Sequence, residues 1–391
     1  MDTDLIIIGA GPAGLSLARS LDGSGLRIHL IEAQPEEALA DPAFDGRDIA
    51  LTHHSVRLLQ DMGVWARLPP GAVGPLREAR VLDGGSSWFL GFDARRERLE
   101  ALGYLVSNHH IRRALYEAVR QQPDVHWRCG RRVTAVRSDR QQASVTLDDG
   151  QRLTAPLVVA ADSRYSRTRQ QMGIPARARD FGRVAIVGRM RHERSNEGVA
   201  YECFQYGGTL AILPVAPYES SIVTTVPAAR ASEIMDMTPA AYAADVARRF
   251  DHRLGEMTPA SERFSYPLVA VHADTFAARR FALVGDAAVG MHPVTAHGFN
   301  LGLSGQDRLA RRLRAAAARG GDLGDAALLQ AYSREHRRET LPLYLGTNGI
   351  VRLFTDDSAP ARLLRKGVLH LSDHLPPVKW AITRKLTAVH G

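Results

Sequence analysis

The chain is poor in cysteine and lacks a long apolar run. Cys129 and Cys203 are its two cysteines, and neither belongs to a CxxC pair. This excludes a disulfide framework or a cysteine metal site and suits a reducing cytoplasm. No apolar stretch reaches the roughly 18 residues of a membrane-spanning helix. Asp2 and Asp4 precede the first apolar run, where a secretory signal would carry positive charge.

Motifs for nucleic acid, metals and nucleophilic catalysis are also missing from the sequence. The net charge of +8 comes from arginines scattered along the chain, without a zinc finger or an RNP motif, so we expect no nucleic-acid partner. HExxH and GxSxG are absent, and we expect no bound metal. A hydrophobic content of 45% over 391 residues predicts a soluble globular protein with two or three structural regions.

A nucleotide-binding pattern opens the chain. The apolar run 5–8 predicts a buried parallel strand, residues 15–21 a helix, and 27–31 a second strand that ends at Glu32. Between the first strand and the helix lies the loop Gly9-Ala10-Gly11-Pro12-Ala13-Gly14. Its glycines permit a tight turn, close approach of a pyrophosphate and packing of helix on strand, and Glu32 can accept ribose hydroxyls. The pattern predicts a dinucleotide site without separating FAD from NAD.

Two further apolar strands end in acids. Residues 157–160 precede Asp162, with Ser166 and Arg169 downstream. Residues 281–284 precede Gly285-Asp286, and a proline-containing loop and a glycine-rich helix start follow at 292–302. Two additional strand-end acids have no place in a simple NAD fold, so they favour FAD.

These motifs together resemble those of the flavoprotein aromatic hydroxylases. That family carries the fingerprints GxGxxG, DGxxSxxR and GDAAHxxxPxxGxGxNxG, and here they occur in the same order. The stretch Arg47–Trp65 is similar to RAxALSxxSxxxLxxLGxW of the ubiquinone-biosynthesis hydroxylases of the UbiH/VisC type. The variant loop 292–300 is similar to their UbiM branch.

The resemblance implies an α/β fold of the glutathione-reductase and p-hydroxybenzoate-hydroxylase type. A Rossmann-like FAD-binding domain would be joined to an inserted antiparallel-sheet substrate domain and a C-terminal helical segment. The expected division is 1–75, 101–175 and 271–335 for FAD, 76–100 and 176–270 for substrate, and 336–391 for the helical segment. A helix presenting Tyr242, Val246 and Phe250 is expected to pack on the sheet, and Phe204, Tyr206, Leu213 and Pro214 are either pocket wall or sheet core.

The resemblance also implies a reaction. NAD(P)H reduces FAD, the reduced flavin and O2 give a C4a-hydroperoxide, and its terminal oxygen passes to a phenol ring. The chain has no second GxGxxG unit, which favours transient docking of NAD(P)H. A polyprenylated phenol is the expected substrate.

FAD contacts are expected from all three fingerprints. Asp286 would face the ribityl–pyrophosphate side, Arg47 the pyrophosphate and Val133 the adenine; otherwise Asp286 is a helix cap and Arg47 a solvated side chain. Arg112 either approaches the cofactor or belongs to a solvated helix face. The full expected set is Gly9, Gly11, Pro12, Ala13, Gly14, Glu32, Arg47, Arg112, Val133, Asp162, Asp286, Pro293, Gly298, Phe299 and Asn300.

The loop 292–300 is expected beside the flavin ring. Pro293 would shape it, and backbone N–H groups of Gly298 and Asn300 would reach the isoalloxazine at a helix N-terminus. His292 and His297 are the titratable side chains of this loop and are candidates for proton transfer from a phenol. The alternative is that both only hydrogen-bond loop backbone.

The sequence departs from the family pattern at several positions. Ser163 replaces the glycine of the second fingerprint, and Val289 replaces the histidine of GDAAH. Ala296 and His297 replace Gly-Gln, and Gly305 stands where many relatives carry aspartate. These changes leave the substrate and the rate open.

The basic tail suggests a place at a membrane. Six Lys or Arg residues and one acid lie in 361–391, with Trp380 among apolar positions. Such a segment can lie on an anionic inner membrane face, which suits a cytoplasmic, peripheral enzyme with other quinone-biosynthesis proteins as partners; alternatively it packs on the body. Rival functions are hydroxylation of a small soluble phenol or benzoate, a flavin halogenase (disfavoured because WxWxIP is missing), and a non-catalytic FAD-binding component.

Overall fold

A parallel sheet brings the three fingerprint strands together. The computed structural model describes residues 3–83, 89–205, 208–293 and 297–355. Its six-stranded sheet has the order β19-β20-β12-β1-β2-β8, parallel except for β19 against β20. The bounds are Leu5–Ile8 (β1), Ile28–Ile31 (β2), Val125–Arg128 (β8), Leu157–Ala160 (β12), Ala277–Ala278 (β19) and Phe281–Leu283 (β20). The apolar runs are explained by burial on both faces of this sheet.

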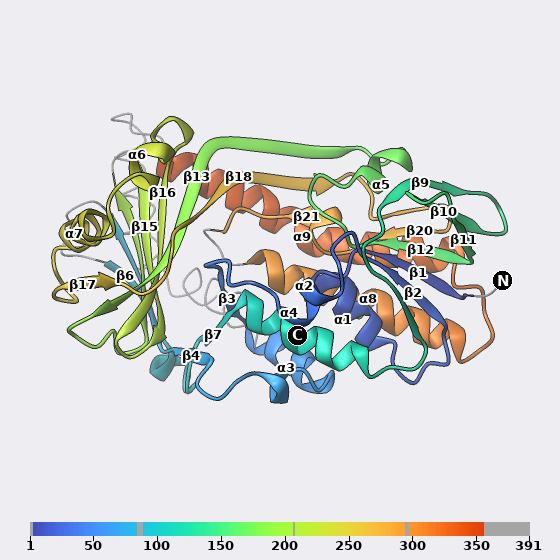
Figure 1. Cartoon of the computed structure of the whole chain (residues 1–391), viewed down its shortest axis with the longest axis horizontal. Helices are drawn as coiled ribbons and strands as arrows, with labels where there is room; N and C mark the ends of the chain where they lie inside the picture. Colours follow the sequence, from blue (N-terminus) through green and yellow to red (C-terminus); the bar gives the residue numbers. More distant parts are fainter. Residues whose placement is uncertain (1–2, 84–88, 206–207, 294–296, 356–391) are drawn as a thin grey trace.

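Helices cover the parallel sheet. Helix α1 packs between α4 and α8, and α9 lies along α8 (Figure 1). The helix bounds are Pro12–Ser20 (α1), Glu37–Ala40 (α2), His53–Asp61 (α3), Asn108–Arg120 (α4), Arg167–Gln171 (α5), Ala231–Met235 (α6), Pro239–Arg249 (α7), His297–Ala317 (α8) and Ala326–Thr355 (α9).

Two small sheets connect the larger parts. One joins β8 to β12 and consists of β9 (Val133–Ser138), β10 (Ala143–Leu147) and β11 (Arg152–Ala155). The other, called the connecting sheet below, has the order β3-β7-β4, with bounds Asp48–Leu51 (β3), Gly103–Ser107 (β7) and Val73–Leu76 (β4).

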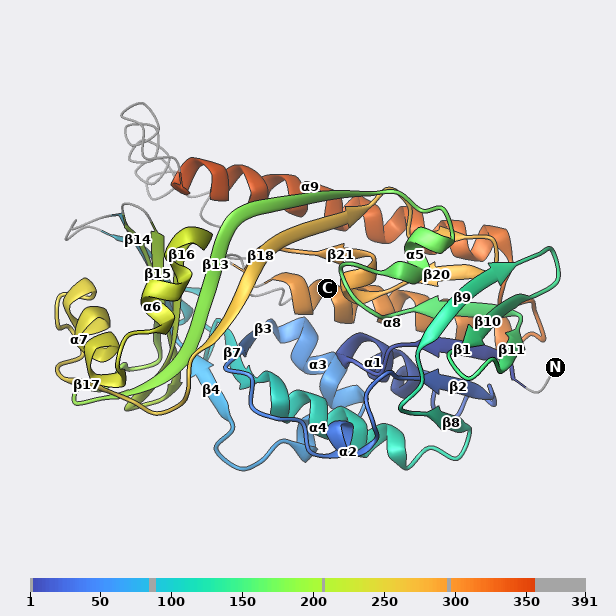
Figure 2. The ribbon, with the colours of Figure 1, turned by 45° about the horizontal axis from the view of Figure 1, so that its top comes forward.

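A nine-stranded sheet, called the large sheet below, forms the other end of the molecule. Its order is β21-β18-β13-β16-β15-β14-β5-β6, with β17 beside β13. The bounds are Glu78–Asp83 (β5), Phe89–Asp93 (β6), Ala176–His192 (β13), Val199–Gln205 (β14), Gly208–Ala216 (β15), Glu219–Pro227 (β16), Met257–Pro259 (β17), Phe264–Ala273 (β18) and Val289–Gly290 (β21). Strands β13 and β18 run from beside the parallel sheet to this far end (Figure 2). The strands within 176–270 pair antiparallel as expected, and β14 pairs in parallel with β5 from the earlier segment. A long chain segment separates these two strands, so no hairpin forces them to be antiparallel.

The two faces of the large sheet have different coverings. Helices α6 and α7 cover one face, and Tyr242, Val246 and Phe250 are buried there with Cys203, as the sequence predicted. The opposite face is directed toward the connecting sheet and the parallel sheet (Figure 1). On β14 the side chains alternate, so Cys203 lies on the helix-covered face and Phe204 on the inner one.

Three of the expected domain boundaries fall inside regular elements, and one of these lies within β4, between residues 75 and 76. The other two lie in longer elements. Helix α9 continues through residues 335 and 336, and strand β18 continues through 270 and 271. Neither position carries a glycine or proline that would interrupt the backbone, so the chain crosses from one region to the next within an element. The expected basic tail 361–391 and Tyr206 lie outside the described residues. Within the described ranges, no helix is both long and apolar enough to cross a membrane.

Candidate FAD and substrate site

The expected cofactor-binding loops lie at one edge of the parallel sheet. Strands β20, β12, β1 and β2 are consecutive neighbours and run in the same direction, so their carboxyl ends share an edge. Asp286, Asp162, Gly9 and Glu32 follow these strands in that order. Residues from distant parts of the sequence therefore meet at the carboxyl edge of the sheet, which is where open α/β sheets bind ligands.

The glycine loop has the shape of a phosphate cradle. Gly9 has φ +103°, and a Cβ there would lie 2.6 Å from the Ala161 carbonyl oxygen. A Cβ on Gly14 would lie 1.9 Å from the Gly9 oxygen, whereas one on Gly11 would meet no protein atom within 4 Å. Gly11 caps α1 without a side-chain hydrogen bond, and Pro12 occupies the first turn. The helix N–H groups at Ala13 and beyond thus face an open space, which fits the pyrophosphate of FAD.

Glu32 supports the glycine loop from the neighbouring strand. Its Oε2 accepts the Ala10 N–H at 2.7 Å, and its Oε1 accepts the Gln34 N–H at 2.9 Å. Each carboxylate oxygen has further lone pairs, so the same group can also accept ribose hydroxyls.

The second fingerprint forms a compact turn around Asp162. The Asp162 Oδ2 accepts the hydroxyls of Ser166 and Thr168, each at 3.0 Å. Ser163 does not adopt a positive φ, so its replacement of glycine introduces no backbone strain. Arg169 is buried and donates to the carbonyl oxygens of Arg164 at 3.2 Å and Ala287 at 3.0 Å. The second fingerprint is thereby tied to the third.

Asp286 forms an ion pair that the sequence did not predict. Arg164 Nη2 lies 2.9 Å from Asp286 Oδ2, and Arg164 Nη1 donates to the Val269 carbonyl at 3.0 Å. The Asp286 side chain keeps 42% of its surface exposed. Arg164 belongs to the variable part of the second fingerprint, so no signal marked it in advance.

Asn300 fastens the start of α8 to the connecting sheet. Its Nδ2 donates to the Ala50 carbonyl at 2.9 Å, and its Oδ1 accepts the Thr52 N–H at 3.1 Å. The side chain is therefore structural, while Gly298 and the partly buried Phe299 remain at the first turn. This arrangement fixes the position of the helix N-terminus.

The two histidines of the 292–300 loop differ in environment. His292 is buried edge-on against Phe181, with 4.8 Å between ring centroids. Burial, with a further contribution from Arg183, lowers the His292 pKa to about 4. His292 is therefore neutral near pH 7 and a weak base. His297 is half-buried in the first turn of α8, and Pro293 is exposed.

Three of the expected cofactor residues belong to segments other than the fingerprint loops. Arg47 pairs with Asp45 at 2.5 Å and lies over the Tyr266 ring at 5.2 Å. Arg112 is half-buried in α4, without a hydrogen bond or ion pair to any described residue. Val133 begins β9.

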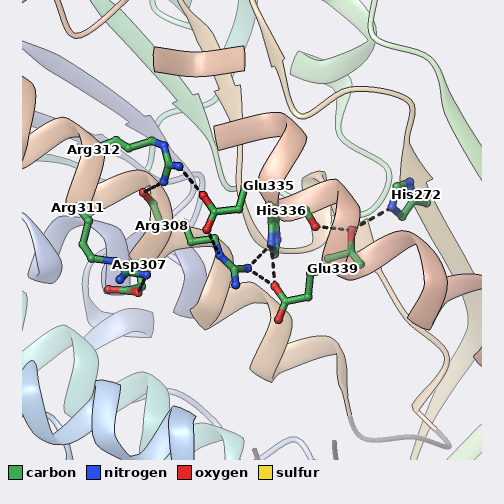
Figure 3. A network of polar contacts seen from close by, with 9 residues as sticks. His272, Asp307, Arg308, Arg311, Arg312, Glu335, His336 and Glu339 are labelled. Carbon is green, nitrogen blue, oxygen red and sulfur yellow. Dashed lines mark hydrogen bonds and ion pairs between the residues drawn. The ribbon is translucent and has the colours of Figure 1, made fainter. Parts of the chain in front are cut away.

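Gly305 on α8 makes room for a histidine of α9. A Cβ at Gly305 would lie 2.4 Å from His336 Nε2, and His336 is 0% exposed. Arg308 joins the helices by donating to His336 Nδ1 at 3.3 Å and by pairing with Glu335 at 3.1 Å and with Glu339 (Figure 3). Gly305, which stands where many relatives carry aspartate, thus leaves the space that the His336 ring occupies. In the described part of the chain no His, Cys, Asp and Glu residues are grouped so as to hold a metal.

Comparisons with known proteins identify the family to which the chain belongs. Residues 2–340 match the FAD-binding domain family. The chain is 46% identical to ubiquinone hydroxylase UbiM of Neisseria meningitidis, over 99% of this chain and 85% of the relative. It is 38% identical to ubiquinone hydroxylase UbiL of Rhodospirillum rubrum, over 96% and 87%. The fold matches p-nitrophenol 4-monooxygenase of Pseudomonas putida with a TM-score of 0.77 at 17% identity, over 100% of this chain and 98% of that one. The chain belongs to the ubiquinone-biosynthesis hydroxylase family and is an FAD-dependent monooxygenase with NAD(P)H as co-substrate.

Proposed function

We propose that this protein hydroxylates the aromatic ring of a polyprenylated phenol on the route to ubiquinone, using NAD(P)H and O2. The observation that carries the proposal is the shared strand edge, where a phosphate cradle and α8 lie near the inner face of the large sheet. The two relatives named as ubiquinone hydroxylases support the substrate class. Bound FAD supplies the redox chemistry, by accepting a hydride and activating oxygen.

In this proposal the sheet edge holds the cofactor. Gly9, Gly11 and Gly14, with Pro12 and Ala13, accommodate the pyrophosphate at the start of α1. Glu32 binds the ribose, while Asp162 and Asp286 hold the opposite wall. Arg47 reaches the pyrophosphate after exchanging its Asp45 partner, and Arg112 and Val133 lie beside the adenosine part.

The α8 end of this sheet edge serves the flavin ring. The backbone N–H groups of Gly298, Phe299 and Asn300 stabilise negative charge on the pyrimidine, because they belong to a helix N-terminus. Pro293 shapes the covering loop. His297 is the stronger of the two histidine candidates for proton transfer from the phenol, because a pKa of about 4 makes His292 a weak proton acceptor.

Quinone profiling tests the function. Deleting the gene should stop ubiquinone synthesis and accumulate one prenylated intermediate that lacks a ring hydroxyl. The purified protein with FAD should then convert that intermediate, with one O2 and one NAD(P)H consumed per product. Normal quinone levels in the deletion strain, with no intermediate accumulating, would count against the proposal.

Two alternatives have distinct outcomes. Fast turnover of soluble hydroxybenzoates, with no response to prenylated phenols, would identify a hydroxylase of small phenols. FAD binding without substrate-dependent O2 consumption would identify a non-catalytic component of a biosynthetic complex. This second alternative remains relevant because Val289, His297 and Gly305 differ from the residues of the family fingerprint.

We further propose that the protein works in the cytoplasm at the inner membrane face, with other quinone-biosynthesis proteins as partners. The excess of basic residues in 361–391 supports this proposal. Removing 361–391 should abolish co-flotation with anionic vesicles while a shorter, soluble substrate is still hydroxylated. Unchanged flotation of the truncated protein would rule out this anchor.

A further inference from the structure

Glu202 is a carboxyl group on the inner face of the large sheet. It lies in the middle of β14, between Tyr201 and Cys203, which both belong to the core under α7. Because side chains alternate along a strand, Glu202 lies on the opposite face, with Phe204. That is the face directed toward the connecting sheet and the parallel sheet (Figure 1).

The surroundings of Glu202 on this face are apolar. Its direct cross-strand partners are Ala211 on β15 and Val81 on β5. Phe204, and Leu90 and Phe92 of β6, form a small apolar cluster on the same side, and Val81 packs against it. Glu202 is only half-buried, although Phe204 and Ala211 beside it are 5% and 8% exposed. Glu202 is therefore less buried than the neighbours on its own face.

Among the residues that the structure describes, Glu202 has one polar partner and no cation beside it on the same face of the sheet. Thr209 of β15 hydrogen-bonds its side chain. Asp83, opposite Phe204, is the nearest charged residue by strand register. On the same face Arg189 lies three strands away on β13, where it pairs with Asp48. Within the described part of β5, β6, β14, β15 and β16, the inner-face positions carry no Lys or Arg.

This environment favours the neutral acid. Desolvation raises the Glu202 pKa to about 7, against the opposing effect of the Thr209 hydrogen bond. A neutral carboxyl group can donate one hydrogen bond and accept others, which suits a phenolic or methoxyl oxygen. An apolar wall with one such group binds an aromatic ring and fixes its orientation.

We propose that Glu202, supported by Thr209, is a polar subsite that binds a ring oxygen of the substrate and so orients the ring in the pocket. The inference rests on the proposed function and adds a residue that contacts the substrate. Neutral Glu202 donates its proton in a hydrogen bond to the ring oxygen, and the apolar neighbours hold the ring edge. Ionised Glu202 retains water in the pocket and weakens binding.

Ligand binding to the FAD-loaded enzyme tests the subsite. The probes are the methyl ether of a short prenylphenol, whose ring oxygen can only accept a hydrogen bond, and the matching prenylbenzene without the ring oxygen; the flavin absorbance change reports the dissociation constant. For the wild type, affinity for the ether should fall about tenfold as pH rises through the Glu202 pKa of about 7, because ionised Glu202 can no longer donate the hydrogen bond. Prenylbenzene affinity should not change with pH.

Three variants separate the possibilities. Glu202→Gln should bind the ether without this pH dependence, because its amide donates at every pH, and Thr209→Val should shift the midpoint upward, because it removes the bond that opposes the rise in pKa. Glu78→Gln, on the helix-covered face of the adjacent strand, is the matched control and should behave as wild type. A pH profile for ether binding that is the same in Glu202→Gln as in the wild type would overturn the subsite but leave the function intact. Failure of the wild type to bind or hydroxylate any prenylphenol would overturn both.

Discussion

At the scale of single residues, the same amino acid has different tasks within one loop. Gly9 is required by its positive φ and by Ala161 beside it. Gly14 is required because its Cα lies against the Gly9 carbonyl, while Gly11 faces open space at a helix start. Two of these glycines therefore serve the fold, and Gly11 serves the ligand.

Alanine substitution separates these tasks. Gly14→Ala should destabilise the FAD-free protein by about 2–4 kcal/mol, because strand and helix must move apart. Gly11→Ala should leave that stability within about 1 kcal/mol, since its φ of −72° suits alanine. It should nevertheless weaken FAD binding at least tenfold, or about 1.4 kcal/mol, by filling the pyrophosphate space. Urea unfolding and FAD titration measure the two effects, and equal FAD affinity of Gly11→Ala and wild type would refute this assignment of the cradle.

The two loop histidines should differ in their effect on the pH profile. A pKa near 4 leaves His292 neutral from weakly acidic to alkaline pH, so His292→Ala should keep the shape of the profile for the maximal hydroxylation rate. His297→Ala should remove one limb of that profile and lower the rate about 100-fold if it accepts the phenol proton. An unchanged rate and profile in His297→Ala would remove it from proton transfer.

At the scale of elements, the sequence predicted features that depend on short segments. The strands that precede Gly9, Asp162 and Asp286 were recognisable because apolar runs, glycines and acids are adjacent in the chain. Contacts between distant segments left no such signal. The Asn300 side chain hydrogen-bonds the backbone of Thr52 and Ala50, which lie 248 and 250 residues earlier in the chain. Glu202 looks in the sequence like an ordinary polar residue of an alternating strand. Its apolar surroundings arise from register with β5 and β15, which only the assembled sheet defines.

The packing of α8 on α9 depends on the fit between Gly305 on α8 and His336 on α9. Gly305→Ala should destabilise the protein by about 1–3 kcal/mol, because buried His336 occupies the added volume. In a His336→Ala background the same change should instead be neutral or stabilise by up to about 1 kcal/mol, because alanine is the better helix former. Thermal or urea unfolding of the four proteins gives the coupling energy. Additive effects would show that the two side chains do not compete for space.

At the scale of the whole molecule, a buried ion pair joins the large sheet to the connecting sheet. Arg189 on β13 lies 2.7 Å from Asp48 on β3, and its Nη2 also donates to Ser107 on β7 at 3.0 Å. The side chain of Asp48 is 1% exposed. The position of the proposed substrate roof over the cofactor edge therefore depends on a buried ion pair as well as on apolar contacts.

Removing one partner of the Arg189–Asp48 ion pair should lower the free energy of unfolding more than removing both. Arg189→Met leaves the Asp48 carboxylate buried without its counter-ion and should lower the free energy of unfolding by about 3–5 kcal/mol. The double variant Asp48→Asn with Arg189→Met should recover most of that loss, because no uncompensated charge remains. As a control, Arg230→Met breaks the exposed pair with Glu233 and should change stability by less than about 1 kcal/mol. Urea unfolding measures all three, and a double variant at least as unstable as Arg189→Met would show that the ion pair itself, rather than charge compensation, holds the two sheets together.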